Sequence, residues 1–271
     1  MNMVDYELIY EENDNEWASY HGIALKSGFD NYLSSRVKDR LYDIEGINFL
    51  VEEFENLAST GFERDILIDI FSTLQSIENW KIGEALAECY LEDYERVKFY
   101  YPPSRDLRNP KTNLQGADLV GFIDIDEETT IFLFGEVKTS GDESSPPKIM
   151  YGRSGMIDQL CEIKNNPDLR KSLIKWLGFK VKLLSDKDPF KKDYRKALKI
   201  YIQEGMEDKY YLIGILIRDT IPKETDLKSR YKSLKDDLTK EARLKLIALY
   251  IPIRIKEMER YVIIKQVKTD E

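Results

Sequence analysis

Two carboxylates and one ammonium group stand in an apolar part of the sequence. Asp118 lies in the run Gly116–Phe122, and Glu136 and Lys138 lie near the end of the run Ile131–Lys138. Charged residues are uncommon inside such runs, because an unpaired buried charge is costly. Two carboxylates can hold a hard divalent cation, and a lysine beside them can position a water or stabilise charge beside a phosphate.

The two runs are predicted to form antiparallel strands. Both are rich in β-branched and aromatic residues, and a short acidic link of residues 124–130 joins them. Side chains alternate between the faces of a strand, so Glu136 and Lys138 share a face with Phe132 and Phe134. An aspartate on the neighbouring strand can then converge with them. The alternative is a buried structural salt bridge that performs no chemistry.

Apolar spacing predicts the elements on either side of these strands. Two helices fall in Phe62–Tyr94, a short strand in Val97–Tyr101, a helix in Ser154–Asn165 and a strand in Tyr210–Ile217. The order from Phe62 is therefore αβββαβ. The flanking parts are predicted to form strands at Asp5–Ile9, Gly22–Leu25, Leu244–Ile253 and Arg260–Ile264, and helices at Arg36–Tyr42, Ile47–Leu57, Asp168–Leu177 and Leu227–Thr239.

The helix predicted at Lys81–Tyr94 has small residues at three of the positions from 83 to 87, which allow close packing on a sheet. Glu84 lies among them, and Glu88 lies one turn later on the same face. The alternative is an acidic stripe exposed to solvent, formed by Glu84, Glu88, Glu92 and Glu95.

The charges are divided unequally along the chain. Residues 1–100 contain 22 acidic and 8 basic residues, a net charge of −14, which leaves +5 for the remaining 171 residues. Between Arg170 and Lys199, eleven basic residues face only three aspartates. Local patches attract polyanions whatever the net charge, so this stretch is a candidate nucleic-acid surface. The alternative is a basic helix surface that is only solvated.

The composition excludes several classes of protein. A single histidine, His21, makes a histidine-based triad or a multi-histidine zinc site very hard to build. Cys89 and Cys161 give neither a disulfide framework nor zinc-ligand spacing. The acidic N-terminus lacks a signal-peptide pattern, and no apolar run approaches the roughly 18 residues of a membrane span. A cytoplasmic protein without a membrane partner is expected.

The arrangement Asp118…Glu136-Val137-Lys138 resembles the signature of the PD-(D/E)xK nuclease superfamily. The αβββαβ order matches the restriction-endonuclease-like core of that superfamily. The resemblance implies an α/β fold with a mixed central sheet, plus N-terminal and C-terminal extensions. It also implies Mg²⁺ or Mn²⁺ bound by Asp118, Glu136 and the Val137 carbonyl, with Lys138 orienting the attacking water.

Enzymes of this superfamily often use two further residues near the metal. One is an additional acidic residue on the helix before the sheet, a position that Glu84 matches. The other, in some families, is a polar residue on the helix after the motif, a position that Gln159 matches. An exposed helical glutamine is the alternative for Gln159.

Three segments resemble a narrower family, the HamA nuclease subunit of the Hachiman anti-phage defence system. They are Gly83–Glu88, Gly116–Asp118 and Gly135–Ser140, and the resemblance covers roughly Lys81–Gln159. It implies a DNA nuclease without sequence specificity that assembles with a superfamily 2 helicase. In that family the helicase restrains the nuclease, and DNA damage caused by phage releases it.

The sequence therefore predicts a metal-dependent deoxyribonuclease in two parts. Residues 1–60 are an acidic extension that docks a partner or covers the DNA site, and residues 61–271 are the nuclease domain with C-terminal strands. The alternatives are a ribonuclease with the same site and a non-catalytic adaptor with a degenerate nuclease fold. Phosphate contacts are predicted at Lys180, Lys182, Lys191, Lys192, Arg195, Lys196, Arg105 and Arg108.

Overall fold

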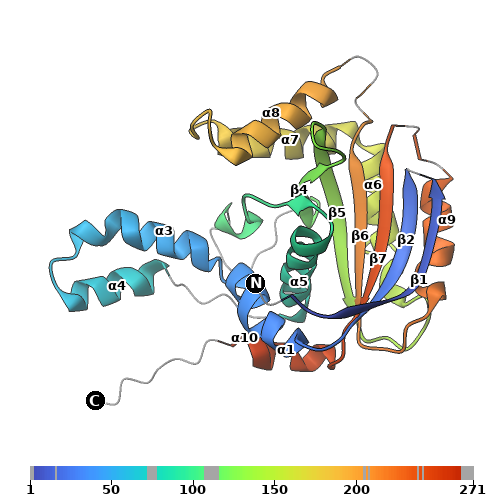
Figure 1. Ribbon diagram of the computed structural model, residues 1–271, viewed down its shortest axis with the longest axis horizontal. Helices are drawn as coiled ribbons and strands as arrows, with labels where there is room; N and C mark the ends of the chain where they lie inside the picture. Colours follow the sequence, from blue (N-terminus) through green and yellow to red (C-terminus); the bar gives the residue numbers. More distant parts are fainter. Residues whose placement is uncertain are drawn as a thin grey trace.

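The chain has a mixed α/β fold, seen in a computed structural model that describes residues 3–15, 17–71, 78–106, 116–203, 206, 208–236, 238–239 and 241–263. In this part, seven strands form one sheet (Figure 1). They are β1 (Tyr6–Asn15), β2 (Ala18–Leu25), β3 (Val97–Lys98), β4 (Leu119–Asp124), β5 (Thr130–Ser140), β6 (Tyr211–Arg218) and β7 (Arg243–Tyr250). Their order across the sheet is β1–β2–β7–β6–β5–β4–β3.

The centre of the sheet is parallel and both of its edges are antiparallel. β2, β7, β6 and β5 run in the same direction. β1 pairs with β2 in the opposite direction at one edge, while β4 and β3 add antiparallel pairs at the other. β6 is a nearly continuous apolar run, and seven of its eight residues are buried. Such runs are typical of strands that are covered on both faces.

Helices cover both faces of the sheet. On one face lie α5 (Asn79–Tyr94), α1 (Phe29–Tyr32), a π-helical turn (Leu33–Val37), α2 (Lys38–Leu41) and α10 (Glu259–Val262). On the other lie α6 (Met156–Asn165), α7 (Pro167–Val181), α8 (Pro189–Tyr201) and α9 (Lys228–Lys235). Short 3-10 turns occupy Glu55–Leu57, Pro103–Asp106, Lys148–Met150, Glu224–Asp226 and Ile255–Glu257.

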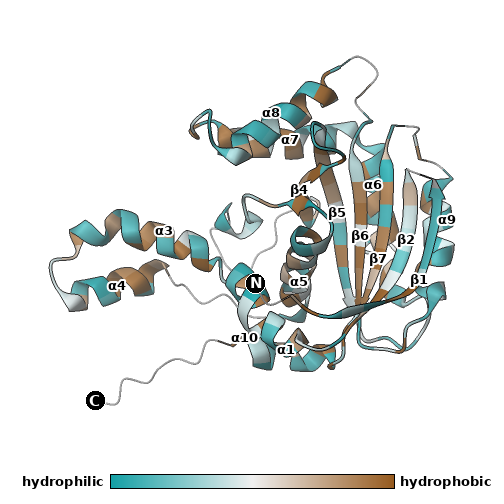
Figure 2. Cartoon of the chain, in the orientation of Figure 1, coloured by the Kyte–Doolittle hydropathy of each residue, from teal (hydrophilic) through white to brown (hydrophobic). Residues whose placement is uncertain are grey.

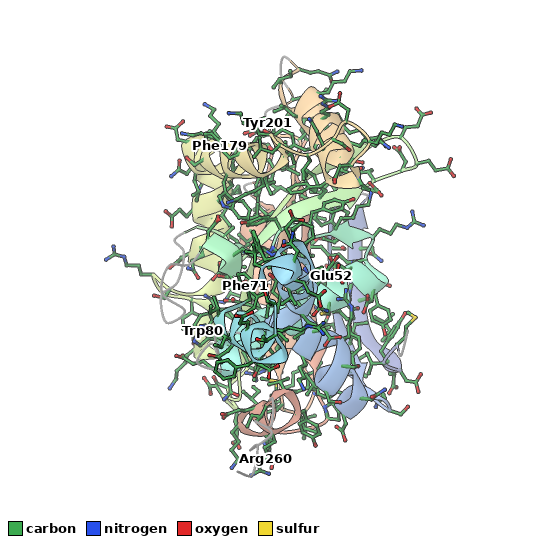
Figure 3. The ribbon with its side chains drawn as sticks, turned by 90° about the vertical axis from the view of Figure 1, so that its left-hand side faces the viewer. Glu52, Phe71, Trp80, Phe179, Tyr201 and Arg260 are labelled. Carbon is green, nitrogen blue, oxygen red and sulfur yellow. The ribbon has the colours of Figure 1, made fainter. Side chains whose placement is uncertain are left out.

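Two helices, α3 (Ile44–Phe54) and α4 (Gly61–Phe71), form a hairpin that projects away from the sheet (Figures 1 and 2). No residue of either helix is buried within the described structure, although both helices carry large apolar side chains. Figure 3 views the molecule from the side on which this hairpin projects, with Phe179 and Tyr201 of α7 and α8 above Glu52 and Phe71 of the hairpin.

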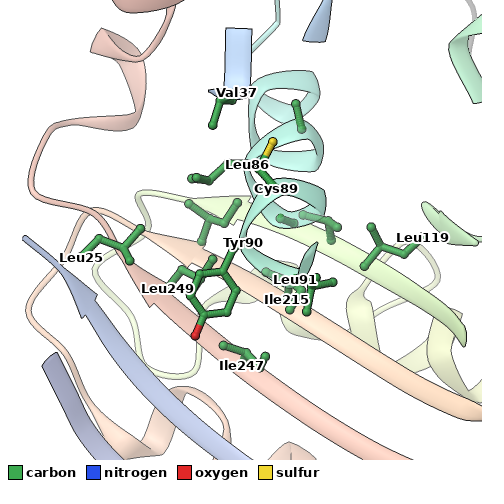
Figure 4. Close-up of a cluster of buried hydrophobic side chains, with 14 of the residues drawn as sticks. Leu25, Val37, Leu86, Cys89, Tyr90, Leu91, Leu119, Ile215, Ile247 and Leu249 are labelled. Carbon is green, nitrogen blue, oxygen red and sulfur yellow. The ribbon is translucent and has the colours of Figure 1, made fainter. Parts of the chain in front are cut away.

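The sheet separates two apolar cores. Leu86 and Tyr90 of α5 pack over Ile215, Ile247 and Leu249 of the central strands (Figure 4). The second core, on the α6–α9 face, contains the other set of alternating strand side chains. β5 contributes to both, with Ile131, Leu133 and Val137 in the first core and Phe132 and Phe134 in the second. The predicted alternation along β5 is therefore confirmed.

The structure confirms most of the predicted elements and corrects two of them. The predicted strand Arg260–Ile264 is wrong: residues 259–262 form α10, and Ile264 lies outside the described residues. A strand there would have no edge beside β7, because β2 and β6 already pair with it. The predicted strand Val97–Tyr101 shortens to β3, since the backbone N–H of Phe99 donates to Glu92 Oε1 instead of continuing the ladder.

The predicted acidic extension, residues 1–60, contributes to the sheet and to its cover. Its two predicted strands pair as expected within the longer β1 and β2, and β2 joins β7. Tyr32, Leu33 and Val37 are buried in the core beside α5. The predicted docking role of this region stays a prediction. In the part of the chain that the structure describes, no helix is long and apolar enough to span a lipid bilayer.

Candidate active site

A cavity of about 910 Å³ lies at the edge of the two apolar cores, where α5, β5 and α6 meet. Its lining includes Glu84, Asp118, Glu136, Lys138 and Gln159. All the side chains that the sequence places in the catalytic and metal-binding set therefore reach one cavity, from elements that lie up to 75 residues apart in the chain.

Strand pairing positions the two motif carboxylates. β4 and β5 are antiparallel, and Leu119 pairs with Gly135, so Asp118 comes opposite Glu136 at the end of the ladder. Asp118 Oδ2 accepts a hydrogen bond from the backbone N–H of Val137 at 3.0 Å. This bond fixes the Asp118 carboxylate beside β5. The predicted convergence of the acidic residues from the two strands is present in the structure.

Glu136 is almost completely buried, with 1% of its surface exposed. Its Oε1 forms an ion pair with the Lys138 ammonium, two residues further along the same face of β5. Its Oε2 has no hydrogen-bond partner among the described residues. Burial, followed by the charge of Asp118, raises the pKa of Glu136 to about 8, and the Lys138 ammonium opposes this rise.

Glu84 reaches the cavity from α5. Burial raises the pKa of Glu84 to about 9, and the negative charges of Asp118, Glu88 and Glu136 add to the rise. The small residue before it allows this approach, because a Cβ atom at Gly83 would overlap Thr139 Oγ1 on β5. The predicted close packing of this helix is therefore confirmed, and it brings a third carboxyl group into the electric field of the other two.

The solvent-exposed acidic stripe, the alternative for this helix face, is wrong, since none of its four members is exposed. Glu88 is buried and lies 3.6 Å from Arg40. Glu92 accepts hydrogen bonds from the Arg36 and Arg40 guanidinium groups. Glu95 pairs with Lys245 at 2.5 Å. The face turns inward because strands and the α2 region cover it.

Gln159 lies on α6, across the cavity from α5. Its Oε1 atom is buried and, like Glu136 Oε2, makes no hydrogen bond in the described part of the chain. The alternative of an exposed glutamine is therefore wrong. A buried amide oxygen without a donor is costly, and a cation or an ordered donor in the cavity would satisfy it.

The residues fit an oxygen-binding divalent cation by their chemistry. Carboxylate, carbonyl and amide oxygens are the ligands that Mg²⁺ and Mn²⁺ prefer. The described side chains contain no ready-made group of three or more His, Cys, Asp or Glu residues at metal-binding distance. Glu84 is therefore not counted as a direct ligand, although the charges of Asp118 and Glu136 act on its carboxyl group. The ligand set that fits best is Asp118, Glu136 and the predicted carbonyl of Val137. The side chain of Val137 itself is buried in the opposite core.

Lys81 is a cavity residue that the sequence analysis did not identify. Lys81 is 8% exposed and lines the cavity, and its Nζ lies 5.3 Å from the centre of the Trp80 ring. Lys81 is three residues before Glu84, which places both on neighbouring positions of one helix face. Helical spacing from Glu84 was the signal that could have identified it.

The predicted phosphate contacts include residues that are engaged within the protein. The Arg105 guanidinium binds Asp43 with two hydrogen bonds of 2.6 Å. Lys180 pairs with Asp106, and both Lys191 and Arg195 lie 3.0 Å from Asp186. Lys182, Lys192 and Lys196 are exposed. Arg108 lies outside the described residues.

The basic surface of α8 stands apart from the acidic cavity. Lys196 of α8 lies close enough to Asp124 for its charge to act on that carboxyl. Burial raises the pKa of Asp124, but hydrogen bonds from Lys98 and Thr130 and the charge of Lys196 lower it further than burial raises it. Asp124 pairs with Thr130, at the start of β5. Thr130 lies six residues before Glu136, and a strand rises about 3.3 Å per residue, so the separation is about 20 Å. A nucleic-acid duplex is long enough to contact both the basic surface of α8 and the acidic cavity, whereas a mononucleotide is not.

Searches of protein-family models and of curated proteins find no match to this chain.

Proposed function

We propose that this protein is a Mg²⁺- or Mn²⁺-dependent nuclease that hydrolyses DNA without sequence readout. The observation that carries the proposal is the meeting of Asp118, Glu136 and Lys138 at one end of the β4–β5 pair, in a cavity that also holds Glu84 and Gln159. A buried carboxylate oxygen without a donor, beside a second carboxylate, is a site that favours a cation.

The fold supports the same assignment. The elements α5, β3, β4, β5, α6 and β6 come in the order αβββαβ, with α7 and α8 inserted between α6 and β6, and β6 is parallel to β5. This is the order of the restriction-endonuclease-like core. β1, β2 and β7 would then be additions that widen the sheet on the β6 side.

The roles of the residues follow from their positions. A divalent cation, when bound, lowers the pKa of a coordinated water and neutralises phosphate charge. Asp118 and Glu136 would hold this cation, and the N–H of Val137 keeps the Asp118 carboxylate in place. Lys138 opposes the rise in the pKa of Glu136 that burial causes, and its ammonium can stabilise the charge that develops on the phosphate. Gln159 can accept a hydrogen bond from a water in the cavity.

We also propose membership in the PD-(D/E)xK superfamily and, more narrowly, a role like that of the Hachiman nuclease subunit. The support is the sequence of the three matching segments and the site that they build. A nuclease without sequence readout endangers the DNA of its own cell, so restraint by a partner is required. The proposed partner is a superfamily 2 helicase.

A cleavage assay tests the chemistry. The purified chain is incubated with plasmid, linear duplex, single-stranded DNA and RNA, each with Mg²⁺, with Mn²⁺ and with a chelator. Cleavage that needs the metal and is lost in Glu136→Ala and Lys138→Ala supports the proposal, and Glu127→Ala, at an exposed position of the β4–β5 link, is the matched control. Cleavage of RNA alone would favour the ribonuclease, and metal-independent cleavage would contradict the proposal.

The structural salt bridge remains the competing explanation of the Lys138–Glu136 contact. A stability measurement on the same variants separates the two. Removing one member of a structural buried pair is strongly destabilising, by roughly 3–5 kcal/mol. A site built for a cation instead relieves repulsion when Glu136 is neutralised, so the metal-free protein should keep or gain stability.

Co-expression with the helicase tests the partnership. The proposal expects a stable complex on size-exclusion chromatography, with weak cleavage until the helicase engages DNA and ATP. If the two chains elute separately, or if the free chain and the complex cut equally well without ATP, the restraint by a helicase is wrong.

A further inference from the structure

The α3–α4 hairpin exposes an apolar surface of unusual extent. Phe49, Leu57, Phe62 and Ile70 are each 60–75% exposed, and no residue of either helix is buried in the described structure. Helices of this length are marginal in water unless an apolar face is covered. Contiguous exposed apolar patches mark interaction sites. The hairpin therefore presents a surface that is suited to a protein partner.

This surface is also strongly acidic. Residues 43–71 contain eight aspartates and glutamates and a single basic residue, Arg64. Arg64 is itself paired with Glu55 at 2.9 Å. A surface that covers the hairpin must therefore have apolar side chains at its centre and positively charged side chains around them.

The same chain carries such a surface between α7 and α8. A groove of about 630 Å³ is lined by the apolar residues Ile174, Phe179, Leu198, Tyr201 and Ile202. Lys171, Lys175 and Lys182 line the same groove, and all three are exposed. Their spacing of four and seven residues keeps them on one side of α7. The groove thus has the apolar side chains and the positively charged side chains around them that the hairpin requires.

The α7–α8 pair and the hairpin are both seen in Figure 3, which views the molecule from the side on which the hairpin projects. In that view the groove residues Phe179 and Tyr201 lie above Glu52 and Phe71 of the hairpin. A twofold axis that lies in the plane of this view, perpendicular to the line that joins the two surfaces, would place each hairpin opposite the α7–α8 pair of the other copy. Such an arrangement is closed, since it leaves neither surface uncovered.

We propose that the α3–α4 hairpin of one chain docks in the α7–α8 groove of a second copy, and the reverse, in a twofold dimer. The area is sufficient. Eight large apolar side chains of the hairpin are exposed, and at on the order of 100 Å² for each, two reciprocal contacts reach the roughly 1,200–2,000 Å² of a stable interface.

The acidic cavity borders the elements that carry both docking surfaces. The cavity is lined by Leu41, just before α3, by Trp80, after α4, and by Leu169 in the first turn of α7. These lining residues place the cavity next to the bases of the two docking surfaces. If the proposed nuclease activity is correct, the dimer is a shielded form of the enzyme, but the dimer itself does not depend on that activity.

Sedimentation velocity of the full chain tests the proposal through charge exchange. The groove variant is Lys171→Glu/Lys175→Glu/Lys182→Glu, and the hairpin variant is Glu52→Lys/Glu53→Lys/Asp69→Lys; all six residues are exposed. Each variant alone places like charges opposite each other in both contacts. An equimolar mixture places opposite charges in both. A control, Arg254→Glu/Lys256→Glu/Arg260→Glu, makes the same change in net charge as the groove variant, elsewhere on the surface.

The wild type and the control should sediment as a dimer of the 31.8 kDa chain at tens of micromolar. Each three-residue variant should be monomeric, and the mixture should dimerise again. The Kd of the wild type should rise about tenfold or more between about 50 and about 500 mM NaCl. A monomeric wild type, a dimer that either variant leaves intact, or a mixture that stays monomeric would each overturn the proposal and leave the hairpin to a different protein.

Discussion

Lys138 binds one oxygen of the Glu136 carboxylate and leaves the other oxygen without a hydrogen-bond partner among the described residues. The two residues are neighbours on one face of β5, so no other element is needed to bring them together. The ammonium offsets part of the cost of burying the carboxylate. The second oxygen points to a ligand that the protein itself does not supply.

Glu136→Gln is expected to reduce metal-dependent cleavage by about 100-fold or more, because a neutral amide cannot replace a carboxylate ligand of Mg²⁺. The substitution keeps the shape of the side chain, so the melting temperature should stay the same or rise. Cleavage rates and thermal denaturation are measured on the same preparation. Unchanged activity would assign the chemistry to other residues.

Stability without metal should fall as the pH rises. The folded-state pKa values of Glu136 and Glu84, about 8 and about 9, exceed the ordinary value of 4.5. Between these limits the folded protein keeps protons that the unfolded chain releases, so the stability that these two groups contribute is fully present below about pH 4.5 and is lost toward pH 9. Thermal denaturation in a chelating buffer between pH 5 and pH 9 measures the slope.

Mg²⁺ should raise the melting temperature more at pH 8.5 than at pH 5.5, because the cation replaces the bound protons. The double variant Glu84→Gln/Glu136→Gln should lose both the pH slope and the response to Mg²⁺. A wild-type protein that melts at the same temperature with and without Mg²⁺ at both pH values would contradict the metal site.

Lys138→Met should lower cleavage and move its pH profile upward. Without the ammonium, the pKa of Glu136 rises further, so a higher pH is needed before the carboxylate can bind the cation. The loss at the optimum should be about 100-fold, since the charge beside the phosphate is also removed. Lys138→Arg keeps the charge and should restore the position of the profile. A profile that Lys138→Met leaves in place would show that Lys138 does not influence Glu136.

Gly83→Ala should destabilise the protein, although glycine to alanine in a helix ordinarily stabilises it. A Cβ at this position overlaps Thr139 Oγ1, and such overpacking typically costs about 1–3 kcal/mol. Adding Thr139→Ala removes the obstructing atom and should restore the stability. Chemical denaturation of both single variants and the double variant gives the coupling. A stabilised Gly83→Ala protein would mean that α5 does not need its close approach to β5.

Nucleic-acid binding should depend on salt and on the exposed part of the basic surface. Lys192→Glu/Lys196→Glu should weaken binding to all sequences alike, because phosphate contacts carry no sequence information. Lys191→Glu/Arg195→Glu should weaken it less, since both residues already share Asp186. Fluorescence anisotropy at several salt concentrations measures both effects. A flat salt dependence would show that this surface does not bind DNA.

The sequence predicted the strands of the site well, because their side chains obey the two-residue period of a buried strand. It also predicted that Asp118 and Glu136 converge, since an antiparallel pair needs only local geometry. It could not predict that the acidic face of α5 turns inward. That result depends on Arg36 and Arg40, which pack over the helix from a distant part of the chain.

The sequence showed that residues 170–199 are basic, but it did not show which of the predicted phosphate contacts form ion pairs within the protein. Asp43, Asp106 and Asp186 lie far from each other in the chain and neutralise several of the predicted DNA contacts. The helix at residues 259–262 shows the same limit. The run of Tyr261, Val262 and Ile263 suggests a strand, and the occupied edges of β7 exclude one beside it.

The pairing of β2 with β7 sets a condition on how the protein can fold. Ala18 of β2 is joined to Leu244 of β7, more than 200 residues later, and such distant contacts slow folding because a large loop must close first. During synthesis, β5 with Glu136 therefore leaves the ribosome well before the sheet that supports it is complete. In a nascent chain these carboxylates lie in an unfinished sheet until β7 has been made, because the core beside α5 lacks Ile247 and Leu249 until then.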